Sequence, residues 1–233
     1  MKKIGIIGAM EEEVVLLKEK MQVEETCKKA GMEFCMGLLS GKEVVIVRSG
    51  IGKVNAAICT QILVDLFQVE LVINTGVAGS LKNEINIGDI VLSSDALQHD
   101  MDATGFGYEP GIIPRMEESV FKADEKLVQL AKDVCTEVNP DIQAFIGRVV
   151  SGDQFISDSS KKEQLIRDFH GYCTEMEGAA IAQTAYLNGI PFLVIRAISD
   201  KADHSAEMDY GEFEKQAIQH TLHLVTELVK RIE

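Results

Sequence analysis

Segments typical of β-strands and segments typical of α-helices alternate along the whole 233-residue chain. This alternation predicts an α/β fold with a mostly parallel sheet, because parallel strands are joined by crossover connections that helices usually supply. The clearest strand follows Pro191, where residues 192–195 form an unbroken apolar run rich in branched side chains. Such a run is typical of a strand that is buried on both faces. The sequence contains neither an evident linker nor a repeat, so we expect a single domain over residues 1–233.

The other elements are placed by apolar periodicity and by turn residues. Strands are expected at residues 4–8, 32–39, 43–48, 71–74, 89–93, 146–151 and 172–176. Helices are expected at residues 10–20, 53–67, 122–138, 159–169, 178–187 and 212–232. The strands at 32–39 and 43–48 form a hairpin in this prediction, and residues 75–80 form a turn of small residues. The helix at 53–67 has an apolar row on one side, which consists of Val54, Ile58, Ile62 and Leu66.

Residues 95–118 contain glycine, proline and aromatic side chains but little periodicity, and we interpret them as a long functional loop. A monomer would expose the large apolar side chains of this loop, which are Phe106, Tyr108, Ile112 and Ile113. Because monomeric proteins rarely expose large apolar patches, the loop predicts a homodimer with an apolar interface.

The composition limits the possible partners and the compartment. The formal net charge of −14 disfavours nucleic acid, anionic membranes and large polyanionic substrates, and leaves a neutral or zwitterionic small molecule open. No apolar run approaches the ~20 residues of a membrane span, and no N-terminal signal precedes the first strand. The cysteines are odd in number, widely spaced and without a CxxC pair, which indicates reduced thiols rather than a zinc site or a disulfide framework. We therefore expect a cytoplasmic protein.

Three glutamates, Glu11 to Glu13, follow the first strand. The helix dipole stabilises acidic residues at a helix N-terminus, so a purely structural role stays open. Helical phase separates the three, because only Glu13 shares the apolar face that includes Val14 and Leu17. Glu12 lies on nearly the opposite side of the helix from this apolar face. A carboxylate on the inward face, at the carboxyl end of a strand, indicates a functional group.

Further acidic residues follow two other strands. Alternation turns Glu175 and Glu177 to the same face and does not choose between them, whereas the phase of the next helix favours Glu177. Asp200 follows the apolar strand at 192–195, where ligands of open α/β sheets bind. A cap or an ordinary ion pair would explain these residues equally well.

Several familiar motifs are incomplete. The segment from Gly50 to Lys53 lacks the first glycine of a P-loop, and Val54 stands where that motif needs serine or threonine. Residues 98–102 could supply metal ligands, but no second histidine stands at metal-binding spacing. Ser151 and Ser199 lack the context of a catalytic serine, and the histidines other than His99 are expected at the surface. We therefore predict neither a metal nor a cofactor.

Glu13, Glu177 and Asp200 remain, each at the end of a different predicted strand. Carboxyl groups placed in this way suit acid/base cleavage of a glycosidic bond. One would protonate the leaving group, one would activate water, and one would orient the sugar.

The sequence resembles a known family in six motifs that keep their order from end to end. They are Gly5-Ile6-Ile7-Gly8-Ala9-Met10-Glu11-Glu12-Glu13, Ser49-Gly50-Ile51-Gly52-Lys53, Asn74-Thr75-Gly76, Ser151-Gly152-Asp153, Glu175-Met176-Glu177 and Arg196-Ala197-Ile198-Ser199-Asp200. They are similar to those of the bacterial 5′-methylthioadenosine/S-adenosylhomocysteine nucleosidases. The resemblance implies the three-layer nucleoside phosphorylase/hydrolase fold, with a central twisted mixed sheet flanked by helices, and a homodimer. It also implies hydrolysis of an adenine nucleoside.

The resemblance implies roles for the matched positions. Asp200 would protonate adenine at N7, Glu13 would activate the attacking water, and Glu177 would bind the ribose hydroxyls. The implied supporting and substrate-binding residues are Arg196 and Ser199 beside Asp200 and the water, Phe155 and Ile156 at adenine, the Met176 backbone near the ribose, Gly79 and Glu175 at the site, and Met10, Ile51, Phe106 and Tyr210 around the thioether. Phe106 and Pro114 would reach into the site of the partner subunit.

One position departs from this pattern, because Val77 stands where some family members have a serine that helps to hold the water. Here the water would depend more on Glu13 and Arg196, which could lower the rate or alter the preference for the 5′ tail. A phosphate-dependent purine nucleoside phosphorylase and a non-catalytic nucleoside sensor remain alternatives. The sequence does not rank methylthioadenosine, adenosylhomocysteine, 5′-deoxyadenosine and futalosine-type nucleosides, since all carry the same adenine-ribose head.

Overall fold

The computed structural model of the chain describes residues 3–204 and 206–233, without the side chains of residues 207–210, 212 and 214. Its strands are β1 (Ile4–Gly8), β2 (Gln22–Lys29), β3 (Met32–Leu39), β4 (Lys42–Arg48), β5 (Leu71–Ser80), β6 (Ile90–Gln98), β7 (Phe121–Lys122), β8 (Ala144–Ser151), β9 (Cys173–Glu175) and β10 (Phe192–Asp200). Its helices are α1 (Glu11–Lys20), α2 (Lys53–Asp65), α3 (Glu125–Val138), α4 (Ser159–Phe169), α5 (Gly178–Leu187) and α6 (Ala206–Arg231), and a 3-10 turn, η1, spans Thr104–Phe106.

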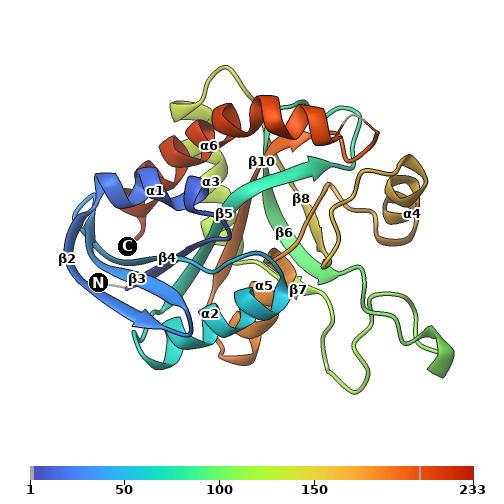
Figure 1. Cartoon of the computed structure of the whole chain (residues 1–233), viewed down its shortest axis with the longest axis horizontal. Coiled ribbons are helices and arrows are strands. Elements are labelled where there is room, and N and C mark those ends of the chain that lie inside the picture. The colour runs from blue at the N-terminus through green and yellow to red at the C-terminus, as the bar shows by residue number, and fades with distance from the viewer. Residues whose placement is uncertain (1–2, 205) are drawn as a thin grey trace.

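A mixed sheet forms the centre of the described structure. Its strand order is β10-β6-β8-β9-β5-β1-β4-β3-β2, with β7 paired to β6. Because β10 pairs with β5 as well as with β6, the strands from β10 to β5 form a closed ring, and the sheet continues from β5 to β2. Helices α1, α3 and α6 lie on one side of this sheet, and α2 and α5 lie on the other (Figure 1). The expected α/β fold with a central mixed sheet between helical layers is confirmed. The expectation of a mostly parallel sheet is wrong, because half of the strand pairings in the described residues are antiparallel.

The sheet positions the site because β1, β5 and β10 run parallel to one another. Their carboxyl ends therefore meet at one edge. All nine residues of β10 are buried, and so are all five of β1, which explains why both read as continuous apolar strands. Polar side chains that stand at the ends of these strands are buried with them.

Three predicted boundaries are wrong because strands continue through small or polar residues. The expected turn at 75–80 is the second half of β5, which pairs there with β10 and β9. Likewise β6 continues to Gln98, so the long loop starts after that residue, and β10 includes Asp200 rather than ending before it. The glycines of β5 provide space: a Cβ on Gly76 would lie 2.5 Å from Glu13 Oε1, and a Cβ on Gly79 would lie 2.7 Å from Asp200 Oδ1.

Other boundaries differ for local reasons. Strand β2 was not expected, because its side chains are almost all exposed and carry no apolar alternation. Helix α3 begins at Glu125 rather than at residue 122, since the Asp124 carboxylate caps it by accepting a hydrogen bond from the Leu127 N–H at 2.9 Å. Strand β8 begins at Ala144 and α6 begins at Ala206, both earlier than their apolar patterns indicated.

Most of the apolar row predicted on residues 53–67 faces outward, whereas Ile62 is half-buried and packs against the core. Val54, Ile58 and Leu66 are exposed to 69%, 43% and 53%, while the buried residues of α2 are Ala56, Cys59, Thr60 and Leu63. The expectation of surface histidines is wrong for His220, which is buried with its Nδ1 2.9 Å from the Gly88 carbonyl oxygen. None of the helices in the described ranges is long and apolar enough to span a membrane.

Candidate active site

A cavity of about 370 Å³ lies at the carboxyl ends of β1, β5, β9 and β10. It is lined by Ala9, Met10, Glu13, Ile51, Val77, Ala78, Gly79, Phe155, Thr174, Glu175, Met176, Glu177, Ser199 and Asp200. All three carboxyl groups predicted to be catalytic therefore meet here, although their sequence positions span most of the chain. Most of the predicted substrate-binding residues lie in the same wall, and Ile156 lines a small adjoining hollow that also includes Asp200.

The remaining predicted site residues lie elsewhere or are outside the description. Arg196 is fully buried beneath the cavity and is not among its lining residues. Phe106 is 88% exposed on η1, and neither it nor Pro114 lines the cavity of its own chain. The side chain of Tyr210 lies outside the described residues.

Glu13 enters the cavity from the first turn of α1 and is only 7% exposed. Its Oε2 accepts hydrogen bonds from the N–H groups of Ala9 and Met10 at 2.7 and 3.0 Å, and its Oε1 accepts one from Val77 at 3.2 Å. Burial raises the pKa of Glu13, although the charge of Arg196 and these amides oppose the rise. The helical-phase argument therefore identified the inward carboxyl group, and Glu12 is exposed as expected.

Glu175 is held by an ion pair with Arg196 that is almost completely buried. Arg196 Nε donates to Glu175 Oε2 at 3.2 Å, its Nη2 also contacts that oxygen, and Nη2 donates to Asn74 Oδ1 at 2.5 Å. The Ser151 hydroxyl and the Gly178 N–H also donate to Glu175. Burial alone would raise the pKa of Glu175, but Arg196 and these donors hold it below its ordinary value. Glu175 is thus an ionised, fully engaged anchor.

Glu177 has a different environment, although it is only two residues away. Its Oε1 accepts a hydrogen bond from the Gly52 N–H at 2.7 Å. Burial, reinforced by the negative charge of Glu175, raises the pKa of Glu177 to about 8. Strand alternation did not choose between the two acids, although helical phase favoured Glu177. The contacts separate them: Glu175 anchors Arg196, while Glu177 presents a carboxyl group to the cavity.

Asp200 ends β10 and is 2% exposed. Its Oδ2 accepts a hydrogen bond from the Ser199 hydroxyl at 2.9 Å, and its Oδ1 accepts one from the Ala202 N–H at 2.8 Å. Gly79 on β5 stands opposite and leaves no space for a side chain, since a Cβ there would also lie 2.8 Å from Ala202 Cβ. The carboxyl group of Asp200 is therefore fixed in orientation at the cavity wall.

Sequence reasoning missed the residues that hold these acids. Asn74, Ser151 and Gly52 belong to motifs quoted above but received no role of their own. Asn74 is buried, accepts from Arg196 and donates to the Ile7 carbonyl oxygen at 3.0 Å. A polar residue inside an apolar strand is the signal that could have identified Asn74 and Ser151.

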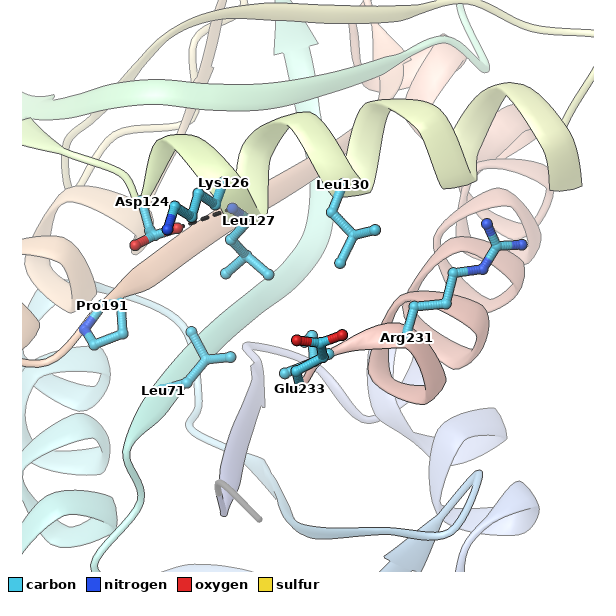
Figure 2. A pocket seen from close by; sticks show the side chains of 9 residues that line it. Leu71, Asp124, Lys126, Leu127, Leu130, Pro191, Arg231 and Glu233 are labelled. Carbon is cyan, nitrogen blue, oxygen red and sulfur yellow. Dashed lines mark hydrogen bonds between the residues drawn. The ribbon is translucent and has the colours of Figure 1, made fainter.

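A second hollow, of about 540 Å³, lies near the amino ends of β5 and β10 (Figure 2). It is lined by Leu71, Asp124, Lys126, Leu127, Leu130, Pro191, Arg231, Ile232 and Glu233. Asp124 caps α3 there, and Arg231 pairs with Glu137 and Glu227. None of the predicted site residues lines this hollow. Among the residues that the structure describes, no group of three His, Cys, Asp or Glu side chains could hold a metal ion.

Comparison with known proteins places this geometry in a family. Residues 3–230 match the family model of the phosphorylase superfamily. The chain is 45% identical over 232 residues to the 5′-methylthioadenosine/S-adenosylhomocysteine nucleosidase of Exiguobacterium sp., with 99% of both chains covered.

Solved structures agree with this placement. The 5′-methylthioadenosine/S-adenosylhomocysteine nucleosidase of Colwellia psychrerythraea, in complex with adenine, is similar with a TM-score of 0.93 and 41% identity over 98% of this chain and 94% of that chain. The futalosine hydrolase of Helicobacter pylori is similar with a TM-score of 0.94 and 34% identity over 99% of this chain and 98% of that chain. The chain therefore belongs to the 5′-methylthioadenosine/S-adenosylhomocysteine nucleosidase family of the phosphorylase superfamily.

Proposed function

We propose that the protein hydrolyses the N-glycosidic bond of 5′-methylthioadenosine and S-adenosylhomocysteine, and also that of 5′-deoxyadenosine, and so releases adenine. The observation that carries the proposal is the convergence of Glu13, Glu177 and Asp200 on one partly apolar cavity. The names of the relatives and the adenine complex of one of them support the same reaction. The activity would serve methionine salvage and S-adenosylmethionine recycling in the cytoplasm.

Asp200 is proposed as the general acid that protonates adenine at N7. Adenine is a poor leaving group as an anion, so protonation of the base lowers the barrier to bond cleavage. The Ser199 hydroxyl and the Ala202 amide fix the orientation of the Asp200 carboxyl group. This orientation supports proton transfer to a base that lies between Asp200 and the aromatic ring of Phe155, which lines the same cavity.

Glu13 is proposed as the general base for the attacking water. A useful base has a pKa near the working pH, and the burial of Glu13 raises its pKa in that direction. Val77 offers no hydroxyl to a water molecule, and its N–H is engaged with Glu13. The water would therefore depend mainly on the Glu13 carboxylate and on the nearby charge of Arg196.

Glu177 is proposed to accept hydrogen bonds from the ribose hydroxyls, with the backbone of Met176 beside them. Positive charge develops on the ribose as the glycosidic bond breaks, and nearby carboxylates stabilise it. Met10 and Ile51 would contact the apolar 5′ tail, since both line the cavity. Gly79, Phe155 and Ile156 would contact adenine.

Water rather than phosphate is the proposed acceptor. A phosphorylase must hold a dianion beside the ribose, which needs arginine or helix-terminus donors. In the described structure neither lysine nor arginine lines the cavity, and Arg196 beneath it is engaged by Glu175 and Asn74. The amino end of α1 is occupied by the Glu13 carboxylate. These contacts disfavour a phosphate site.

A homodimer is also proposed. Val54 and Ile58 on α2 and Leu66 at its C-cap expose apolar side chains, and so do Phe106 and Tyr108 in the loop after β6. A second copy of the chain that covers these residues would bury them and would let Phe106 and Pro114 reach the partner's cavity. Light scattering at micromolar concentration should give twice the 25.6 kDa chain mass, and a value equal to that mass would contradict the dimer.

Incubation of the purified protein with methylthioadenosine tests the reaction. We expect free adenine by chromatography, at the same rate in phosphate-free buffer and in millimolar phosphate, together with a sugar that carries a free anomeric hydroxyl. A phosphate-dependent rate with a ribose 1-phosphate product would favour the phosphorylase, and binding without adenine release would favour a sensor. A panel with adenosylhomocysteine, 5′-deoxyadenosine and futalosine ranks the substrates, because a similar structure is named a futalosine hydrolase.

A further inference from the structure

Three charged residues form a closed set of contacts beside the cavity. Lys53 Nζ donates to Asp100 Oδ1 at 2.6 Å, and the Asp153 N–H donates to Asp100 Oδ2 at 3.0 Å. The Lys53 N–H donates to Asp153 Oδ1 at 2.8 Å, which completes the set. We call these residues the Lys53–Asp100–Asp153 bridge. None of them lines the cavity, but they join the start of α2, the segment after β6 and the segment after β8.

The bridge supplies the cap of α2. The N-cap residue of this helix is Gly52, which has no side chain, so the carboxylate of Asp153 from a distant segment accepts the hydrogen bond instead. Gly52 has a φ of +98°, and a Cβ there would lie 3.1 Å from Asp153 Oδ1. The positive φ and the short distance to Asp153 both favour glycine at this position. Because glycine has no side chain, the start of α2 and the segment after β8 can approach each other closely.

Two walls of the cavity are adjacent to the bridge. The N–H of Gly52, directly before Lys53, donates to Glu177 Oε1, the carboxyl group proposed to bind ribose. Phe155, proposed to stack on adenine, follows Asp153 by two residues and is half exposed. The bridge therefore fixes the ribose side and the base side of the cavity relative to each other.

The charges in the bridge are shielded from solvent, since the side chains of Lys53 and Asp100 are 18% and 17% exposed. Burial alone would raise the pKa of Asp100, but Lys53 and the Asp153 amide hold it below its ordinary value, so this carboxyl group is ionised at neutral pH. Screening is weaker at such a site than at an exposed one. Lys53 Nζ also donates to Gln98 Oε1 at 2.9 Å, and the backbone contact between Lys53 and Asp153 does not depend on Asp100. Removal of the Asp100 carboxylate or of the Lys53 ammonium leaves the other group without its opposite charge and weakens the hold of the segment after β6 on the other two.

We propose that Lys53, Asp100 and Asp153 are positioning residues, which set how closely the Phe155 segment and the Gly52 amide approach a bound nucleoside. The proposal rests on the nucleoside hydrolysis proposed above and assigns new residues to the same site. Glu13 and Asp200 are held by contacts that do not involve the bridge. Loss of the bridge should therefore affect KM more than kcat.

Steady-state kinetics with methylthioadenosine test the proposal in Asp100→Asn and Lys53→Met. We expect KM to rise about tenfold in both, with kcat within threefold of the wild type, because misplaced binding groups lose affinity first. Asp95→Asn is the matched control: Asp95 is also 17% exposed and pairs with Arg148 away from the cavity. Its kinetic constants should stay within twofold of the wild type.

A fluorescence measurement makes the test independent of turnover. The chain has no tryptophan, so Phe155→Trp introduces a single indole on the segment in question. In this background we expect Asp100→Asn and Lys53→Met to lower the indole anisotropy and to weaken adenine binding about tenfold, while Asp95→Asn changes neither.

Equal anisotropy and equal adenine affinity in Asp100→Asn and Asp95→Asn would overturn the bridge proposal, as would a fall in kcat at constant KM. If Asp100→Asn does not fold by circular dichroism, Lys53→Met decides by the same comparison. If the wild type releases no adenine, the proposed hydrolysis fails, and the anisotropy comparison still decides whether the bridge positions the segment.

Discussion

Two hollows lie near opposite ends of β5, one beside Leu71 and the other beside Val77 to Gly79. The first is the larger, at about 540 Å³ against about 370 Å³ (Figure 2). Its polar groups make ordinary structural contacts, such as the cap that Asp124 supplies to α3. In the second hollow, Glu13 and Glu177 are buried carboxyl groups whose pKa values burial raises. The chemistry of the lining therefore selects the candidate active site better than its volume does.

Of the changes in the smaller hollow, a change at Asp200 should have the largest effect on activity. Asp200→Asn keeps the shape of the side chain but removes the proton that we propose it donates to adenine. General acid catalysis typically contributes about 10²–10⁴-fold, so we expect kcat to fall by about that factor while adenine binding persists. Chromatography of released adenine and calorimetry of adenine binding measure the two quantities.

Asp203→Asn is the matched control, because Asp203 follows three residues later and does not line the cavity. Its kcat should remain within twofold of the wild type. If Asp200→Asn retained activity within tenfold of the wild type, the proposed role of Asp200 as general acid would be wrong.

Glu13→Gln should also remove most of the activity, because glutamine keeps the size and the hydrogen-bonding capacity of the side chain but not its basicity. We expect a fall in kcat toward the lower end of the same ~10²–10⁴-fold range. Glu12→Gln, one residue earlier and exposed, should leave kcat unchanged. Equal losses in both variants would show that the inward position of Glu13 does not matter for the reaction.

The third prediction concerns the stability that Glu177 contributes. Its pKa rises from 4.5 to about 8 on folding, so it binds a proton more tightly in the folded protein than in the unfolded chain. Its contribution to the free energy of unfolding is therefore fully present below the unfolded pKa and is lost as the pH rises through the folded value. The loss is at most about 1.4 kcal/mol per pH unit.

Urea unfolding between about pH 5 and pH 8 measures this contribution. Glu177→Gln cannot titrate, so its free energy of unfolding should fall less steeply with pH than that of the wild type. Glu13 has a pKa raised in the same direction and is present in both proteins, so the difference between the two slopes reports on Glu177. Identical slopes would mean that the environment of Glu177 does not raise its pKa.

The sequence predicted those features that depend on local pattern. The inward position of Glu13 followed from helical phase, and the buried strands β1 and β10 followed from unbroken apolar runs. The meeting of Glu13 and Asp200 followed from the rule that parallel strands present their carboxyl ends at one edge.

Features that depend on tertiary contacts could not be predicted in this way. The small residues of β5 have the composition of a turn, but they form a strand because they pair with β10 and β9. Gly76 and Gly79 are small because the Glu13 and Asp200 side chains occupy the space that larger residues would need. The distinction between Glu175 and Glu177 depends on Arg196, which is buried against one and not hydrogen-bonded to the other. The outward apolar row at residues 54–66 has the periodicity of a buried face, and periodicity alone does not say whether the rest of the chain covers such a row.

The smallest effect on activity is expected from a change in the larger hollow. Arg231→Gln removes a positive charge that lines it, together with exposed ion pairs to Glu137 and Glu227. Exposed pairs contribute little to stability, so the fold should persist.

The larger hollow contacts β5 at Leu71, and the smaller cavity contacts β5 from Val77, six residues further along. This separation is roughly 20 Å at the rise of a strand. That distance is more than twice the Debye length at physiological salt, about 8 Å, although charge effects across a protein interior are screened less. We expect kcat/KM for methylthioadenosine to remain within twofold of the wild type. A fall of more than about threefold in a folded Arg231→Gln variant would show that the two hollows are coupled.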